Sequence, residues 1–190
     1  MSERAARHER GSRGITALLV IDMLNPYEHE QADRLAESVA EAIGGVTTLV
    51  ERAGEAGTPI VYVNDNYGDW NSSAEELAGR AGSGRHPELV EPVLPPEGAL
   101  FVIKARHSVF YETPLEYLLD QLGADRLVLT GQVTEQCILY SALDAYVRHF
   151  RVVVARDAVA HIEPDLADAA LAMMERNMRA ELVDAAGCPL

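Results

Sequence analysis

The sequence lacks any long apolar run, and this absence argues against a membrane protein. No stretch approaches the roughly 18 consecutive apolar residues that a membrane span needs. Residues 1–14 contain four arginines and no apolar segment, so they match neither a signal peptide nor an amphipathic presequence. We therefore expect a soluble protein with a loose tail over 1–14 and one folded domain over 15–190.

Cysteine and positive charge are also scarce. Cys137 and Cys188 are too few for a disulfide framework, and without an export signal they indicate a reducing, cytoplasmic location. The chain has 30 acidic against 16 basic residues and a net charge of −14, which repels nucleic-acid phosphates and anionic lipids. We expect neither a nucleic-acid partner nor a membrane partner.

Lysine is nearly missing, because 15 of the 16 basic residues are arginine and only Lys104 is lysine. A site that needs a compact ammonium with an adjustable pKa cannot use a planar guanidinium in its place. Lys104 is therefore a candidate functional residue. The alternative is that one surface lysine survived by chance in an arginine-rich chain.

Six runs of aliphatic and β-branched residues alternate with segments of helical period, which is the pattern of βαβ units around a parallel sheet. We predict an α/β protein of three layers, α/β/α, with a six-stranded parallel sheet of Rossmann or flavodoxin-like type, and favour the flavodoxin-like strand order. The predicted strands are 16–23, 59–64, 99–104, 126–130, 151–155 and 180–183, and the predicted helices are 31–56, 113–122, 134–149 and 164–179.

Helix boundaries carry their own signals. Thr113, Pro114 and Glu116 are typical of a capping box, Gly123 of a helix end, and Thr134 of the N-cap of the next helix. The segment 65–96 is rich in glycine, proline and charge, which predicts a long loop with room for a short helix. Loops of this length are often lids or binding loops.

Three reactive side chains stand at or just after the carboxyl ends of predicted strands, where open α/β sheets bind ligands. They are Asp22 in LLVIDM, Lys104 in FVIK and Cys137 after TGQVTEQ. Each has an ordinary explanation: a turn aspartate, a lysine reaching out of an apolar strand, and a small buried cysteine. Together, however, they supply a base, a cation and a nucleophile.

The position of Cys137 suits a nucleophile. In the first turn of a helix that begins at Thr134, the helix dipole favours thiolate over thiol, and the ammonium of Lys104 would lower the thiol pKa further. Asp22 would accept the thiol proton. The backbone N–H groups of Val133 and Cys137 would stabilise an oxyanion.

The sequence resembles the isochorismatase-like cysteine hydrolases, which include nicotinamidases and N-carbamoylsarcosine amidases. The resemblance rests on LLVIDMLNPY (18–27), KARHSVFYETPLEYLL (104–119) and the segment 127–160. It implies a hydrolase domain over 15–190, with Asp22 as general base, Lys104 as the cation beside the thiolate and Cys137 as nucleophile. It also implies a cis peptide between Gln132 and Val133.

Differences from the subfamilies narrow the chemistry. Nicotinamidases carry a metal-binding Asp-x-His after the second strand, whereas this chain has NDNYGDW there. We therefore predict no metal, no cofactor and a substrate other than nicotinamide. Isochorismatases that cleave a vinyl ether lack the cysteine, so Cys137 favours amide, carbamoyl, lactam or imide hydrolysis through a thioester. Residues expected to line the pocket are Tyr27, Asn66, Tyr67, Trp70, Phe110, Tyr111 and Gln132.

Two other functions remain open from the sequence. One is a vinyl-ether hydrolase in which Cys137 is incidental. The other is a non-catalytic member of the fold that uses Cys137 for redox or ligand binding. For the cysteine hydrolase we expect a small-molecule, amide-type substrate, and we expect the chain to form a homo-oligomer, a dimer or a tetramer.

Overall fold

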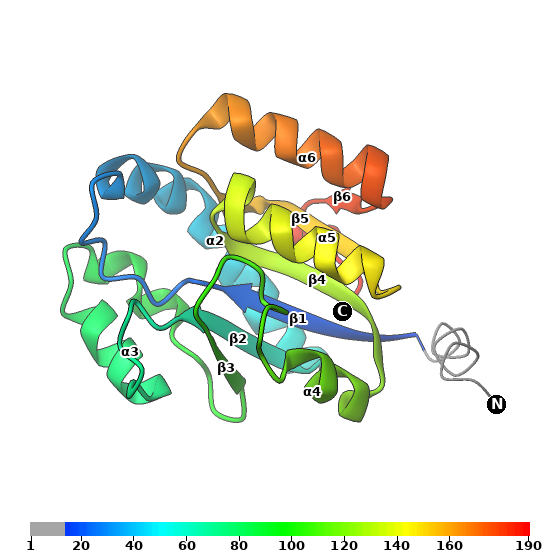
Figure 1. Ribbon diagram of the computed structural model, residues 1–190, viewed down its shortest axis with the longest axis horizontal. Coiled ribbons are helices and arrows are strands. Elements are labelled where there is room, and N and C mark those ends of the chain that lie inside the picture. Colours follow the sequence, from blue (N-terminus) through cyan, green and yellow to red (C-terminus); the bar gives the residue numbers. More distant parts are fainter. Residues whose placement is uncertain (1–13) are drawn as a thin grey trace.

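The computed structural model describes residues 14–190, which form one six-stranded parallel sheet with helices on both faces (Figure 1). The strand order is β3-β2-β1-β4-β5-β6. The predicted tail over 1–14 lies, except for Gly14, outside the described residues. The strands are β1 (Ile15–Ile21), β2 (Ile60–Asp65), β3 (Leu100–Lys104), β4 (Ala124–Gln132), β5 (Arg151–Ala160) and β6 (Glu181–Val183).

The helices cover the two faces unequally. The long helix α2 packs with α3 on one face, and α4, α5 and α6 pack on the other, so the three-layer α/β/α prediction is confirmed (Figure 1). In the described chain no helix is both long enough and apolar enough to cross a membrane. The helices are α2 (Ala32–Ala56), α3 (Ala74–Gly82), α4 (Leu115–Leu122), α5 (Leu139–Val147) and α6 (Pro164–Met178).

β1 lies in the middle of the sheet and is buried on both faces. Leu18 and Val20 pack beneath α2, while Leu19 and Ile21 pack beneath the helices of the opposite face. All four side chains are at most 1% exposed. Burial of such a side chain stabilises the fold by about 1.5–3 kcal/mol. The continuous apolar run of the sequence therefore anchors the end of β1, where Asp22 follows.

The flavodoxin-like order that the sequence suggested is wrong. The observed order is that of a Rossmann sheet, in which β3 lies outside β2 and the order reverses between β1 and β4. Apolar runs show which segments are strands but do not specify their neighbours. β3 is consequently an edge strand, which explains why Ile103 is exposed.

Two predicted helix starts also need correction. α4 begins at Leu115 with Pro114 as its N-cap, and no capping box forms. The hydroxyl of Thr113 donates to Val109 O and accepts the N–H of Leu115 at 3.3 Å. Thr134 is not an N-cap either, because its hydroxyl donates to Ala160 O at 2.9 Å. Gly123 ends α4 in the left-handed conformation as predicted.

The turn before α5 is a short π-helical segment, η4 (Thr134–Ile138). The N–H groups of Gln136 and Ile138 both donate to Val133 O, at 3.0 and 3.1 Å. The turn is therefore wider than an ordinary first turn. It carries Cys137 directly beyond the end of β4.

The long segment after β2 contains more structure than its composition suggested. α3 begins with a capping box in which Ser73 accepts from Glu76 N–H and Glu76 accepts from Ser73 N–H. Two short 3₁₀ turns follow at Pro87–Leu89 and Glu91–Val93. The short helix that the sequence allowed within the segment 65–96 is thus α3.

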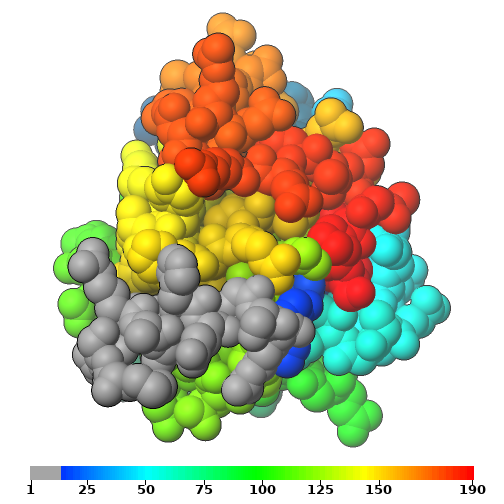
Figure 2. Space-filling view, turned by 90° about the vertical axis from the view of Figure 1, so that its right-hand side faces the viewer, coloured from blue at the N-terminus to red at the C-terminus, as the bar shows by residue number. Residues whose placement is uncertain are grey.

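The C-terminal segment closes the same face of the molecule as α2. Arg52 in α2 donates to Ala185 O and, at 3.1 Å, to Cys188 O. Figure 2 shows the C-terminal residues in red beside the second half of α2 in cyan. Cys188 is buried in this contact and belongs to the apolar cluster beneath α2.

Gly131 allows β4 to approach β1 next to the functional end of the sheet. Its φ is 112°, and a Cβ built on it would lie 2.1 Å from the carbonyl oxygen of Ile21. A side chain at this position would push apart the two strands that precede Asp22 and Cys137. Only glycine fits both the conformation and the contact.

Gly131→Ala is expected to destabilise the protein by about 2–4 kcal/mol, because the methyl group meets backbone atoms that cannot move aside. Urea unfolding followed by circular dichroism measures the change. Gly44→Ala is the matched control: it lies in α2 with nothing within 4 Å of the added methyl group, so it should be neutral or slightly stabilising. Equal stability of the two variants would contradict this account of Gly131.

Candidate active site

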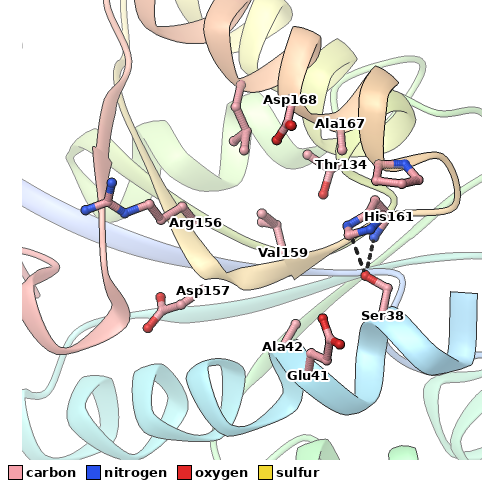
Figure 3. A pocket seen from close by; sticks show the side chains of 12 residues that line it. Ser38, Glu41, Ala42, Thr134, Arg156, Asp157, Val159, His161, Ala167 and Asp168 are labelled. Atoms are coloured by element: carbon pink, nitrogen blue, oxygen red, sulfur yellow. Dashed lines mark hydrogen bonds between the residues drawn. The ribbon is translucent and has the colours of Figure 1, made fainter.

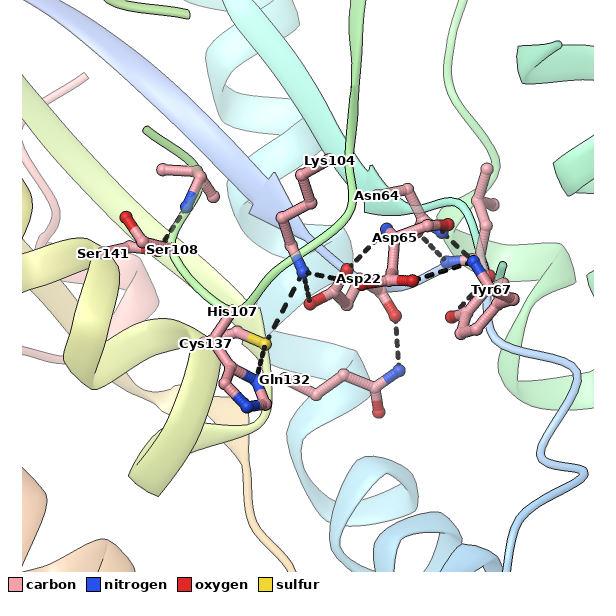
Figure 4. Close-up of polar contacts among 12 residues, drawn as sticks. Asp22, Asn64, Asp65, Tyr67, Lys104, His107, Ser108, Gln132, Cys137 and Ser141 are labelled. Atoms are coloured by element: carbon pink, nitrogen blue, oxygen red, sulfur yellow. Dashed lines mark hydrogen bonds and ion pairs between the residues drawn. The ribbon is translucent and has the colours of Figure 1, made fainter. Parts of the chain in front are cut away.

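Asp22, Lys104 and Cys137 meet at the carboxyl end of the sheet (Figure 4). Lys104 Nζ lies 2.8 Å from Asp22 Oδ2 and 3.7 Å from Cys137 Sγ. β2 separates β3 from β1, so Lys104 stands two strand spacings, or about 10 Å, from the strand that ends at Asp22. A long side chain is needed to cover that distance. The lysine side chain does so by crossing the end of β2.

At Asp22 the backbone leaves the extended conformation of β1, which ends at Ile21. The φ of Asp22 is 56°, in the left-handed region that non-glycine residues seldom occupy. Its N–H donates to Val63 O at 2.9 Å, and its Oδ1 accepts the N–H of Asp65 at 2.8 Å. Gln132 Nε2 donates to the backbone oxygen of Asp22. These contacts fix the carboxylate while its Oδ2 binds the ammonium.

Asp65 is a second carboxylate at the site that the sequence reasoning missed. Its register partner on β3 is Lys104, and its Oδ2 lies 3.6 Å from the ammonium. The available signal was the same one that identified Asp22, namely an aspartate directly after an apolar strand. The sequence analysis places Asp65 at the start of the long loop, whereas it is the last residue of β2.

Lys104 keeps its positive charge although it is only 2% exposed. Burial by itself lowers the pKa of an ammonium, but the charges of Asp22, Cys137 and Asp65 outweigh burial, and the pKa of Lys104 is raised. For Asp22 the balance is different. Burial raises the pKa of its carboxyl group, and the attraction of Lys104 offsets only part of that increase.

The expected thiolate is not favoured in the free protein. Burial and, after it, the carboxylate of Asp22 raise the pKa of Cys137, while Lys104 and the Val133 backbone amide lower it by less. A thiolate would add a further anion to the two carboxylates, those of Asp22 and Asp65, that already lie beside the single ammonium. This balance favours a thiol beside an Asp22–Lys104 ion pair in the free protein. The prediction erred because it counted the cation and the helix dipole but not burial.

The peptide bond between Gln132 and Val133 is cis. Gln132 is buried at the end of β4, and its amide reaches the backbone of Asp22 beneath the site. The backbone amide of Val133 interacts with the sulfur of Cys137. Val133 and the π-helical turn thus lie directly beside the thiol.

A cavity of about 210 Å³ opens onto these groups. It shares Asp65, Tyr67 and Lys104 with a larger chamber of about 820 Å³, which extends along the loops after β2 and β3. Besides Asp22, Lys104 and Cys137, the smaller cavity is lined by Asn25, His29, Gln31, Leu35, Asp65, Tyr67, Gln132, Val133, Gln136 and Ile162.

The residues predicted to line the pocket fall into three groups. Tyr67 and Gln132 line the small cavity, and Asn66, Trp70 and Tyr111 line the larger chamber together with Tyr67. Tyr27 and Phe110 line neither, which corrects the prediction for both. The ring of Tyr27 packs edge-on against His86 beneath α2, and Phe110 stacks on Phe150 under the guanidinium of Arg148. Both aromatic rings serve the apolar core.

A third hollow, of about 270 Å³, lies between α2, β5 and α6 (Figure 3). It contains a serine–histidine pair: Ser38 Oγ lies 3.1 Å from His161 Nδ1 and accepts the backbone N–H of His161 at 2.9 Å. Ser38 therefore ties the chain after β5 to α2. The hollow holds no cysteine, and its contacts are those of a structural link.

The described residues contain no group of three or more histidine, cysteine, aspartate or glutamate side chains arranged to hold a metal ion. Asp65 stands at the aspartate position of the metal-binding Asp-x-His pattern. Tyr67 takes the place of that histidine, and its hydroxyl donates to Leu24 O at 3.0 Å. The donor set at this position is thus unlike that of a metal centre.

Comparison with known proteins identifies the family. The family model described as Isochorismatase domain matches residues 16–187. The chain is 32% identical to an uncharacterised isochorismatase family protein, YaaI, of Bacillus subtilis, over 90% of this chain and 94% of that protein. It is also 32% identical to the maleamate amidohydrolase of Pseudomonas putida, over 78% of this chain and 74% of the relative.

Solved structures agree with the sequence matches. N-carbamoylsarcosine amidase from Thermoplasma acidophilum superposes with a TM-score of 0.73 at 27% identity, covering 93% of this chain and 99% of that one. Nicotinamidase PncA from Bacillus subtilis superposes with a TM-score of 0.69 at 26% identity, covering 89% and 99%. The resemblance noted in the sequence is thereby confirmed, and the chain belongs to the isochorismatase family.

Proposed function

We propose that this protein hydrolyses a carbon–nitrogen bond of a small amide-type molecule, with Cys137 as nucleophile and a thioester as intermediate. The observation that carries the proposal is the position of the Lys104 ammonium, which lies against both the Asp22 carboxylate and the Cys137 sulfur in a buried site. Relatives named as amidohydrolases and amidases support the same bond type.

Acylation starts with a proton transfer from Cys137 to Asp22. A thiol beside a carboxylate and a thiolate beside a carboxylic acid have the same total charge, so the transfer leaves the net charge around the Lys104 ammonium unchanged. The buried site therefore accommodates the transfer without gaining a net charge. The thiolate then attacks the carbonyl carbon of the substrate, and the ammonium of Lys104 remains beside it.

Attack places a negative charge on the substrate oxygen. The backbone N–H groups of Val133 and Cys137 lie in the turn beside the sulfur and are the proposed donors to that oxyanion. Asp22 returns the proton to the departing nitrogen, and the carbon–nitrogen bond breaks. A thioester on Cys137 and a free amine or ammonia result.

Hydrolysis completes the cycle. Water adds to the thioester carbonyl, the carbon–sulfur bond breaks, and the thiol of Cys137 is restored. These steps use side chains and backbone groups of this chain and need no cofactor. The amide side chains that line the small cavity, from Asn25, Gln31, Gln132 and Gln136, suit a small substrate with several hydrogen-bonding groups, such as a carbamoyl compound, an acid amide, a lactam or an imide.

Cys137→Ala is expected to abolish release of ammonia or amine from a panel of such substrates, because the attacking atom is removed. Loss of one buried sulfur near the rim of the core should leave the fold intact. Cys188→Ala is the matched control, since that thiol lies in the cluster beneath α2 and should be dispensable for turnover. Appreciable hydrolysis by purified Cys137→Ala protein would rule out the thioester and favour an ether-cleaving or other cysteine-independent reaction.

Lys104→Arg is expected to lower the rate at least tenfold although the formal charge is kept, because the broad guanidinium does not fit between two carboxylates and the sulfur. Lys104→Met should lower it further. Since Lys104 lowers the pKa of the Cys137 thiol, its removal should move iodoacetamide labelling of Cys137 to higher pH. Labelling against pH is measured beside steady-state turnover, in a Cys188→Ala background.

A different result would assign Lys104 no role. Lys104→Met protein could turn over at the wild-type rate and show an unchanged pH profile for iodoacetamide labelling of Cys137. The single lysine would then be a chance exception in an arginine-rich chain, without a function at the site. The site would then consist of Asp22 and Cys137 alone.

A further inference from the structure

The charges around the small cavity do not cancel. The carboxylates of Asp22 and Asp65 share the ammonium of Lys104, at 2.8 and 3.6 Å (Figure 4). All three side chains line the cavity, and among the described residues of its wall there is no other lysine and no arginine. Two carboxylates against one ammonium leave an excess of one negative charge beside the bond that is to be cleaved.

The remaining titratable side chains of this wall do not offset the excess. Burial lowers the pKa of His29, so its imidazole is uncharged at neutral pH. Burial also raises the pKa of Tyr67 and of Cys137, so both stay protonated. His107 Nδ1 lies 3.6 Å from Cys137 Sγ, but His107 lines neither cavity. The small cavity therefore offers a ligand no positive charge besides the ammonium of Lys104.

The larger chamber has the same excess of negative charge. Its wall contains three carboxylates and two cations, from Asp65, Asp69, Glu112, Lys104 and Arg106. A substrate that extends from the small cavity into this chamber thus meets a second negatively charged wall. The chain as a whole has a net charge of −14, and the resulting field repels anions that approach the cleft.

Asp65 is the charged group of the site that a ligand meets most directly. Its side chain is 30% exposed, whereas that of Asp22 is 10% exposed and that of Lys104 is 1% exposed. Asp65 lines both cavities, and its Oδ1 accepts the N–H of Tyr67 at 2.8 Å, which holds the carboxylate in place. A carboxylate on a substrate would be repelled by Asp65 and would find the ammonium already paired.

We propose that this protein hydrolyses amides with neutral or cationic groups beside the scissile bond, and that Asp65 excludes substrates with a carboxylate there. The proposal rests on the proposed function and narrows its substrate class. A cationic group is attracted by the charge that repels an anionic one, and the N–H groups of a neutral substrate have carboxylate oxygens to which they can donate. Asp65 is thus a specificity-determining residue.

Maleamate and N-carbamoylglycine test the proposal, each as the free acid, the methyl ester and the choline ester. The three forms share one amide or carbamoyl group and differ by one unit of charge at each step. For the wild type we expect kcat/KM of ammonia release to be about tenfold or more lower for each free acid than for its esters. Binding of the same compounds to Cys137→Ala protein, measured by isothermal titration calorimetry, should follow the same order.

Asp65→Asn removes the charge but keeps an oxygen that can accept the Tyr67 N–H. We expect it to raise the ratio of kcat/KM for acid over ester by about tenfold, even where both rates fall because Lys104 has lost a partner. Asp168→Asn is the matched control. It makes the same change of charge at an exposed position of α6 that lines neither cavity, so it should leave the ratio unchanged.

A wild type that hydrolyses and binds the free acids as well as the esters would overturn the proposal. So would Asp65→Asn protein in which acid and ester slow by the same factor, because Asp65 would then only keep Lys104 charged. If the wild type released no ammonia from any compound, while Cys137→Ala protein bound esters more tightly than acids, the proposed function would fail and the charge discrimination would stand. Absence of both turnover and binding for every ester would remove both.

Discussion

The ammonium of Lys104 is held in a nearly dry environment, and the arrangement around it depends on that charge. Asp22 and Asp65 approach it from the ends of two neighbouring strands, and the Cys137 sulfur approaches from the turn after a third. Removing one partner would leave a buried charge without compensation, which costs several kcal/mol. The Rossmann order, the bend at Asp22 and the tight contact at Gly131 bring these strand ends together.

The same charge balance determines where the proton resides. Asp22 and Cys137 both lie against the Lys104 ammonium, and burial raises the pKa of both, so the site disfavours ionising the two groups at once. In the proposed mechanism, Cys137 rests as a thiol and becomes the nucleophile when its proton moves to Asp22. A thiol that is buried and protonated is also protected from adventitious oxidation.

The sequence carried the positions of Asp22, Lys104 and Cys137 because each follows an apolar run, and parallel strands end at one edge of the sheet. It did not reveal the strand order, because a strand that is buried on both faces has the same apolar sequence pattern whichever strands lie beside it. Nor did it reveal Asp65 and His107 as contacts, since both stand in segments that look like loop. Tyr27 and Phe110 were wrongly predicted to line the pocket. The sequence around an aromatic residue near a motif is the same whether its ring faces a pocket or the core.

Infrared spectroscopy measures the protonation state of Cys137 in the free protein directly. In Cys188→Ala protein the only thiol is that of Cys137, so its S–H stretching band can be assigned by difference from a protein that also carries Cys137→Ala. The account predicts a clear S–H band at neutral pH in the absence of substrate. No band at neutral pH, with the band appearing only on acidification, would show a resting thiolate and contradict it.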